Sequence, residues 1–274
     1  MENKVVDLLK EKARQIRRDI VTMLAEAGSG HPAGSLGMAD VFTALYFNVI
    51  NHNPKKPADP NRDRLILSCG HICPAQYAAM ANAGYFQKKE LMTLRKINSR
   101  LQGHPHRNSI PGIENSSGPL GQGLSVAAGI AKALKMDNNK ARVYCITSDG
   151  ENEEGQAWES YLFAAKNKLD NITYILDRNH IQIDGPTDDV MPSLEPMKEK
   201  YEAFNLNVIE IDGNDMRQIL DALEKSKTAK GNPTMIIAHT IPGKGVSFFE
   251  NDYKWHGKTP DKELAEKALK ELGA

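Results

Sequence analysis

Short apolar runs, each followed by a polar turn, recur along the chain between residues 64 and 239. They are rich in Val, Ile, Leu and Tyr, which is typical of buried strands. We predict strands at 64–69, 142–148, 172–177, 208–212 and 234–239.

Apolar residues at steps of three and four predict helices around and between these runs. The clearest helix covers 4–27, where Leu9, Ala13, Ile16 and Ile20 share one face and Gly28 ends the helix. Further helices are predicted at about 38–49, 74–83, 120–135, 155–168, 216–226 and 261–272. Alternating strands and helices favour an α/β fold. We expect a doubly wound, mostly parallel sheet of about five strands with helices on both faces, in one domain over residues 1–274.

Two glycine-rich loops interrupt this pattern, at 28–34 and at 118–123. Glycine permits close approach of the backbone to a ligand, so both loops are candidate site loops. The longest irregular stretch, about 98–117, is also predicted to be functional, because loops of this length are uncommon in compact domains.

Composition and charge exclude several classes of protein. The 274 residues contain 35 Lys and Arg against 35 Asp and Glu, which argues against a general nucleic-acid binder. No stretch approaches the about 18 apolar residues of a membrane span, and the first residues lack the apolar core of a signal peptide. The three cysteines are not spaced as a redox or zinc pair, so we expect reduced core thiols. We predict a cytoplasmic protein with no nucleic-acid or membrane partner.

The second predicted strand ends in Asp149 and Gly150, followed by three glutamates, Glu151, Glu153 and Glu154. Ligands bind beyond the carboxyl ends of parallel strands, and a helix amino end favours anions. The glutamates would nevertheless repel a bare phosphate. A bridging cation removes this conflict, so we predict that Asp149 binds Mg²⁺, which together with backbone donors holds a diphosphate.

Asn179 lies thirty residues after Asp149, at the end of the next predicted strand. Its amide oxygen and the carbonyl of Ile181 are predicted to be further metal ligands, and Ca²⁺ or Mn²⁺ could replace Mg²⁺. Taken singly, Asp149 also suits a helix cap and Asn179 a turn. Their position at adjacent strand ends, beside a second glycine-rich loop, favours the metal site.

These residues resemble the transketolases, thiamine diphosphate enzymes that move a two-carbon ketol unit between sugars. The cofactor signature is matched by Ser148, Asp149 and Gly150 followed by Asn179, with Ser in place of the first Gly. Motifs more particular to the family are Ser29–Pro32, Gly37–Asp40, Gly103–Pro105, Gly118–Gly123 and Asp184–Gly185. The resemblance spans nearly the whole chain but covers only the amino-terminal half of a usual transketolase.

The resemblance implies a split enzyme of the pentose phosphate pathway. This chain would be the amino-terminal, diphosphate-binding subunit, working only with a separate carboxy-terminal subunit in a heterotetramer. Its substrates would be sugars or sugar phosphates, and its cofactors thiamine diphosphate and Mg²⁺. The metal ligands would be Asp149, Asn179 and Ile181. The cofactor would be bound by His71, Gly118, Leu120, Gly150, Asn179 and His256. The catalytic residues would be His31, His104, His256 and Glu154.

Other functions fit parts of this pattern. Another thiamine diphosphate enzyme, of the 2-oxo-acid dehydrogenase or deoxyxylulose-phosphate synthase type, would share Asp149 and Asn179, and a non-catalytic paralogue would retain the fold. Gly28 and Gly30 do not follow a strand, as a dinucleotide fingerprint requires, and 243–245 lacks the hydroxyl residue of a phosphate-binding Walker loop. A zinc site made by His31, His71, His104 and His106 lacks tight ligand spacing.

Overall fold

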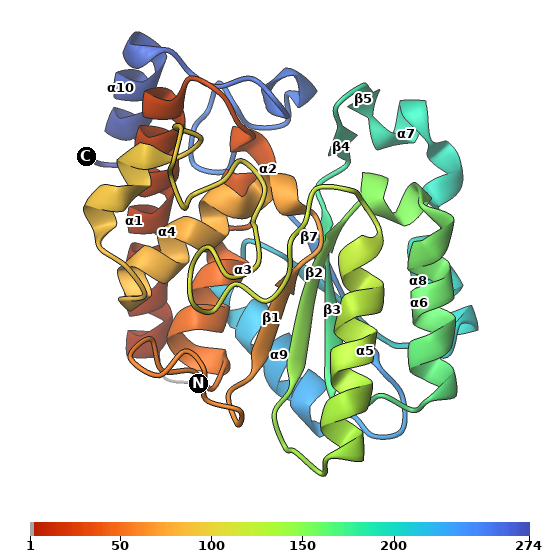
Figure 1. The fold of residues 1–274 in the computed structure, drawn as a ribbon. Helices are drawn as coiled ribbons and strands as arrows, with labels where there is room; N and C mark the ends of the chain where they lie inside the picture. The colour runs from red at the N-terminus through yellow and green to blue at the C-terminus, as the bar shows by residue number, and fades with distance from the viewer. Residues whose placement is uncertain (1–2) are drawn as a thin grey trace.

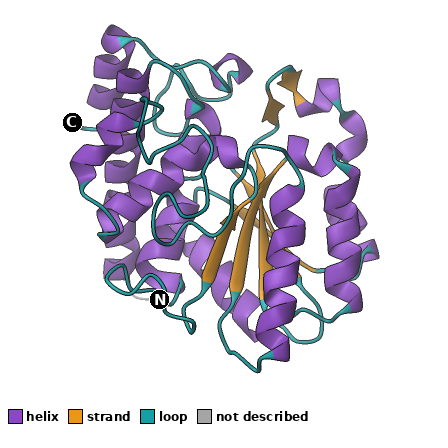
Figure 2. Ribbon diagram, viewed as in Figure 1, coloured by secondary structure: helices purple, strands orange, loops and turns teal. Residues whose placement is uncertain are grey.

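Five parallel strands form the central layer of the molecule (Figures 1 and 2). The structure, a computed structural model, describes residues 3–274. The strands are β1 (Arg64–Leu67), β2 (Val143–Ser148), β3 (Ile172–Arg178), β6 (Asn207–Asp212) and β7 (Thr234–His239), in the order β1-β2-β3-β7-β6. A separate antiparallel pair is made by β4 (Ile181–Gln182) and β5 (Gly185–Pro186). The expected parallel α/β sheet is therefore confirmed.

Side chains of the central strands are buried on both faces of the sheet, which explains why their sequences are continuously apolar. In β2, Val143 and Cys145 pack on one side, whereas Tyr144 and Ile146 pack on the other. The sheet thus separates two apolar clusters, and a different set of helices covers each cluster.

Helices cover both faces. Their bounds are α1 (Asn3–Ala27), α2 (Pro32–Gly37), α3 (Ala39–Ala44), α4 (Cys73–Ala83), α5 (Gln122–Met136), α6 (Gly155–Lys166), α7 (Thr187–Val190), α8 (Met197–Ala203), α9 (Met216–Thr228) and α10 (Lys262–Glu271). One face is covered by α3, α4 and α9, with α1 and α10 outside them, and the other by α5, α6 and α8 (Figure 1). None of the helices over residues 3–274 is long and apolar enough to cross a membrane.

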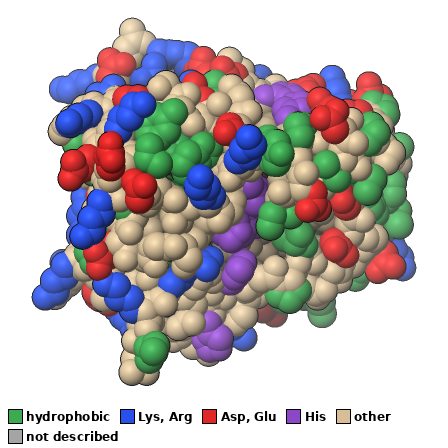
Figure 3. Space-filling view, turned by 90° about the horizontal axis from the view of Figure 1, so that it is seen from above, with side chains coloured by type: hydrophobic (Ala, Val, Ile, Leu, Met, Phe, Trp, Pro, Cys, Tyr) green, Lys and Arg blue, Asp and Glu red, His purple; other side chains and the backbone are tan. Residues whose placement is uncertain are grey.

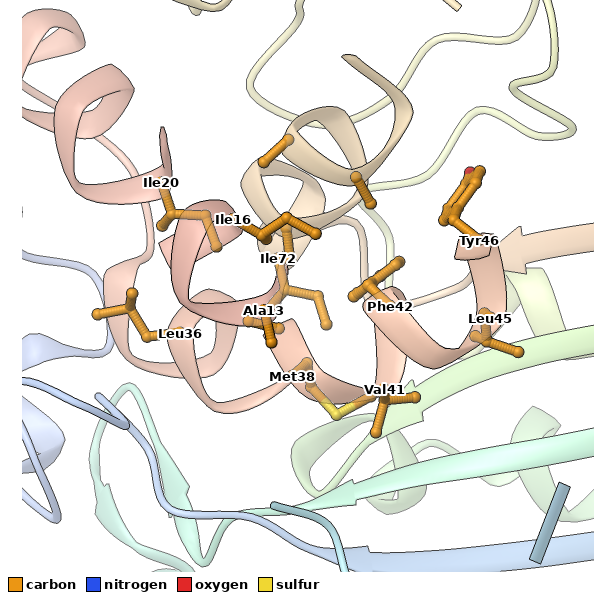
Figure 4. Packing of buried hydrophobic residues seen from close by; sticks show 14 of the residues in the cluster. Ala13, Ile16, Ile20, Leu36, Met38, Val41, Phe42, Leu45, Tyr46 and Ile72 are labelled. Carbon is orange, nitrogen blue, oxygen red and sulfur yellow. The ribbon is translucent and has the colours of Figure 1, made fainter. Parts of the chain in front are cut away.

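The larger cluster is built around α1. Ile16 and Ile20 from this helix meet Leu36, Phe42 and Ile72 from the segments that follow it (Figure 4). Burying each such side chain contributes roughly 1.5–3 kcal/mol. This packing fixes the start of α2, and with it one wall of the site described below.

The structure differs from the predicted elements around residues 28–49. Helix α2 begins at Pro32, inside the predicted loop, because proline is favoured in the first turn of a helix, where its missing N–H has no partner to lose. The single helix predicted at 38–49 is instead α3 followed by a π-helical turn, Leu45–Val49. The β4–β5 pair, α7 and α8 were not predicted, since elements this short carry no clear periodicity.

Candidate functional site

A cavity of about 370 Å³ opens at the carboxyl edge of the sheet. Seen from this edge, histidine side chains form a band across the surface (Figure 3). The cavity is lined by His31, His71, His104, Gly118, Leu120, Ser148, Gly150, Glu153, Glu154, Asn179, Ile181, Gln182, Ile183, Asp184 and His256. Every predicted site residue except Asp149 lines it, and Asp149 is buried between two residues that do.

The two carboxylate oxygens of Asp149 have different surroundings. Oδ2 accepts a hydrogen bond from the backbone N–H of His180 at 2.8 Å and lies 3.1 Å from Nη1 of Arg178. Oδ1 is buried and has no hydrogen-bond partner. Burial raises the pKa of Asp149 to about 6, against the opposing effect of Arg178. Burying a carboxylate oxygen without a hydrogen-bond partner costs free energy, unless a bound ligand interacts with that oxygen.

Asn179 is held beside Asp149 with its amide oriented. Its Nδ2 donates to Oδ2 of Asp177 at 2.9 Å, and its Oδ1 accepts from the N–H of Ile181 at 3.0 Å. Asp177 in turn accepts from the hydroxyl of Thr240, and burial raises the pKa of Asp177 to about 7. An amide oxygen has a second lone pair, so Asn179 can still bind a cation.

The donors that the structure brings together are thus oxygens, which suit a hard cation such as Mg²⁺. Across residues 3–274, no three His, Cys, Asp or Glu side chains are grouped as they would be to hold a metal. The four-histidine zinc alternative also fails on position, since His106 does not line the cavity.

Glu151 has a role that the sequence analysis missed. It is fully buried, and its Oε1 accepts from the Ser68 hydroxyl and from the N–H of Gly121 at 2.7 Å. It therefore ties the glycine-rich loop 118–123 to the ends of β1 and β2. Only its burial distinguishes it from Glu153 and Glu154, and the sequence does not show burial.

The glycine-rich loop needs glycine at two positions for separate reasons. Gly118 lines the cavity with φ +150°, a conformation that other residues rarely adopt. At Gly123 in α5, a Cβ would lie 2.6 Å from the Cα of Ser68. Helix α5 can pack this closely on the end of β1 only because residue 123 has no side chain.

Gly123→Ala is expected to lower the free energy of unfolding by about 1–3 kcal/mol, because the Ser68 backbone must move. Urea denaturation measures the change. Gly129→Ala, in the same helix, is the matched control. Its Cβ would meet nothing within 4 Å, so alanine should stabilise the helix by up to about 1 kcal/mol. Equal effects at both positions would contradict the close packing.

Four histidines from four separate segments converge in the cavity. His31 precedes α2, His71 follows β1, His104 lies in the long connection before α5, and His256 follows the 3₁₀ turn Tyr253–Trp255. The ring centroid of His31 lies 5.2 Å from that of His71, 5.5 Å from that of His256 and 6.2 Å from that of His104. The structure thus brings the predicted histidines together, while their roles stay predictions.

These imidazoles are neutral at neutral pH. Burial, aided by His256, lowers the pKa of His31 to about 3, and burial lowers the pKa of His71 well below its usual value. The pKa values of His104 and His256 are lowered for the same main reason. A neutral imidazole has one N–H donor and one acceptor nitrogen, and Nδ1 of His31 is buried without a partner. The cluster can therefore exchange hydrogen bonds with hydroxyl groups without carrying positive charge.

His31→Gln is expected to make the protein less sensitive to acid. The folded-state pKa of His31 lies below the unfolded value of about 6.5, so the stability that its neutral form contributes is complete above that pH. That contribution is lost as the pH falls towards about 3, because the unfolded chain then binds the extra proton. Urea unfolding at neutral and at acidic pH should show a smaller loss for the variant than for the wild type. Equal losses would contradict the low pKa.

Glu154 lies at the rim of the cavity. It is exposed and occupies the N-cap position of α6. Gln182 in β4, which the sequence analysis did not identify, also lines the cavity, and its Oε1 is buried without a partner. Its position three residues after Asn179 could have identified Gln182 as a candidate. A strand of two residues, however, has no hydrophobic pattern from which the direction of its side chains could be predicted.

Both tryptophans of the chain lie beside segments of this site. The indole N–H of Trp158, in α6, donates to the carbonyl of Asn152, in the turn that follows Asp149, at 3.0 Å. Trp255 directly precedes His256 and is mostly buried. Trp158 also lines a separate hollow of about 390 Å³. None of the predicted site residues lines this hollow.

Comparison with known proteins agrees with this geometry. Residues 8–274 match the family "Transketolase, thiamine diphosphate binding domain". The chain is 42% identical over 267 residues to one of the subunits of the apulose-4-phosphate transketolase of Actinobacillus succinogenes, covering 97% of this chain and 96% of that protein. It is 40% identical over 272 residues to 6-deoxy-6-sulfo-D-fructose transketolase subunit SqwG of Clostridium sp. (strain MSTE9), covering 99% and 98%.

A solved transketolase structure shares the fold. The crystal structure from Campylobacter jejuni aligns with a TM-score of 0.91 and 34% identity, covering 100% of this chain and 43% of that one. The chain thus spans nearly the full length of the two related subunits but less than half of the Campylobacter jejuni transketolase. It belongs to the transketolase family of transferases, of which it represents the thiamine diphosphate-binding domain.

Proposed function

We propose that this chain is the amino-terminal subunit of a two-chain transketolase, which transfers a two-carbon ketol unit from a ketose to an aldose with thiamine diphosphate and Mg²⁺. Residues 1–274 would form its single diphosphate-binding domain. The observation that carries the proposal is the buried, unpartnered Oδ1 of Asp149, adjacent to a cavity lined by Asn179 and Ile181. A location in the cytoplasm and a role in the pentose phosphate pathway stay predictions of the sequence.

In this proposal Asp149, Asn179 and the carbonyl of Ile181 hold the cation, with Ca²⁺ or Mn²⁺ as possible substitutes. The cation offsets the charge of a diphosphate, which Gly118, Leu120 and Gly150 admit at close range. When bound, thiamine diphosphate supplies a carbon nucleophile able to carry a two-carbon unit. With the cation bound, the negative charges of Glu153 and Glu154 at the rim would no longer prevent an anionic group from binding.

The histidines act on the sugar in this proposal. His31, His104 and His256 are neutral, so each can donate a hydrogen bond to a sugar oxygen or accept one from a hydroxyl. Donation to an oxygen that gains negative charge stabilises that charge, and the acceptor nitrogen can take a proton from a hydroxyl. His71, deepest in the cluster, is assigned to the cofactor.

A second chain is required in this proposal. The two relatives that this chain covers almost completely are named as subunits of transketolases. We place the carboxy-terminal subunit beside Glu154 at the rim, where it would contribute the cofactor's ring-binding groups in a heterotetramer. The sugars in the names of these two relatives, apulose-4-phosphate and 6-deoxy-6-sulfo-D-fructose, both carry an anionic group, so we propose sugars with a terminal phosphate or sulfonate as substrates.

The test is to purify the chain alone and together with a candidate carboxy-terminal subunit. Cofactor binding, two-carbon transfer between sugars and release of CO₂ are then measured. We expect carbon-conserving transfer from the two chains together and none from this chain alone. CO₂ release would indicate another thiamine diphosphate chemistry, and cofactor binding without turnover by the assembled chains would indicate a non-catalytic paralogue.

A further inference from the structure

Arg178 controls one of the two oxygens of the proposed metal ligand Asp149. Its Nη1 lies 3.1 Å from Oδ2, and the backbone N–H of His180 donates to the same oxygen. The ion pair and the backbone hydrogen bond thus both fall on Oδ2, whereas Oδ1 has no hydrogen-bond partner. The two oxygens of the carboxylate therefore have different surroundings.

The guanidinium is fixed and not free to turn away. Its side chain is 1% exposed, and it donates to the Thr187 hydroxyl at 2.8 Å and to Oε1 of Glu195 at 2.6 Å. These partners lie in the segment after the β4–β5 pair. Because several partners hold the planar group at once, displacing it from Oδ2 would leave buried donors unpaired.

This asymmetry bears on the choice of cation. Ca²⁺ takes six to eight oxygens at about 2.3–2.6 Å and often binds a carboxylate through both, whereas Mg²⁺ requires octahedral geometry at about 2.0–2.1 Å. We propose that Arg178 is a positioning residue that restricts Asp149 to coordination through Oδ1, and thereby biases the site towards Mg²⁺ over Ca²⁺. This inference rests on the proposed function, because it assumes that the site holds a divalent cation.

Arg178 also acts through its charge, and the two effects can be separated. Its positive charge weakens the binding of any divalent cation near Asp149, and by a similar factor for Mg²⁺ and Ca²⁺. The ratio of the two affinities therefore reports on the geometry of the carboxylate. A residue with a purely structural role would not change this ratio.

The experiment uses the chain assembled with its carboxy-terminal subunit and thiamine diphosphate. Mn²⁺ serves as an electron paramagnetic resonance reporter, which Mg²⁺ or Ca²⁺ then displaces. For Arg178→Met we expect the Mg²⁺-to-Ca²⁺ affinity ratio to fall by about tenfold, the lower end of the effects seen when groups holding a metal ligand are removed. Circular dichroism establishes that the variant is folded. If it does not fold, Arg178→Lys replaces it and should shift the ratio in the same direction, since one ammonium group cannot bond Oδ2 and Glu195 together.

Arg17→Met is the matched control. Arg17 is also buried and paired with a buried carboxylate, that of Asp40, but neither residue lines the cavity. It should leave the ratio unchanged. An unchanged ratio in the folded Arg178 variant, with metal binding still lost in Asp149→Ala, overturns this inference alone. Two results would overturn the proposed function as well. One is that the wild type binds Mn²⁺ without needing thiamine diphosphate or Asp149. The other is that the wild type binds no Mn²⁺ at all.

Discussion

Asp149→Ala is expected to abolish Mg²⁺-dependent binding of thiamine diphosphate by the assembled complex, with a loss of affinity above about 100-fold. Removing a direct ligand should cost more than removing a group that only orients one, for which about 10–100-fold is typical. The substitution takes away the buried Oδ1, which no protein group satisfies. Isothermal titration with the cofactor, at fixed Mg²⁺, measures the change.

Two controls make this result interpretable. Asp212→Ala removes an exposed carboxylate at the end of β6, on the same edge of the sheet but outside the cavity, and should bind normally. Thermal unfolding without ligand shows whether Asp149→Ala is folded. In that variant Arg178 keeps its bonds to Thr187 and Glu195, so a folded protein is expected. Unchanged affinity in a folded variant would exclude Asp149 as a metal ligand.

His104→Ala is expected to keep cofactor binding while lowering the turnover of the assembled enzyme by about 10²–10⁴-fold, the usual range for loss of a group that transfers protons. His104 lies above Gly118 at the less buried side of the histidine cluster, where a sugar can reach it. The comparison needs kcat and the cofactor affinity measured on the same preparation.

His106→Ala is the control for this variant. It lies two residues further along the same connection, is exposed and does not line the cavity, so turnover should be unchanged. Normal turnover in His104→Ala would refute its role in the reaction. Loss of cofactor affinity in parallel with turnover would instead assign His104 to the cofactor.

The fold and the position of the site follow from local sequence signals. Apolar runs predict the strands because parallel strands are buried on both faces, and β2 and β3 are indeed neighbours, with Ser148 opposite Asp177. Asp149 and Asn179 therefore had to meet. The order β3-β7-β6 could not be predicted, because nothing local to β7 specifies which strands flank it.

What escaped prediction depends on contacts between distant segments. Glu151 and Glu154 look alike in the sequence, yet one is fully buried against Ser68 and the other is exposed. Nothing in the sequence indicated that Arg178 would form an ion pair with Asp149, since the guanidinium is held in place by Glu195, a residue 17 positions further along the chain. Burial and partner choice of this kind are set by tertiary packing.

The placement of Trp158 and Trp255 gives this protein a built-in optical reporter. One indole is hydrogen-bonded to the turn that follows Asp149, and the other adjoins His256, so no other region contributes to the tryptophan emission. A change in that emission when a molecule enters the cavity would follow occupancy in real time on unlabelled protein. Replacing each tryptophan by phenylalanine in turn would then show which of the two segments beside the cavity produces the change.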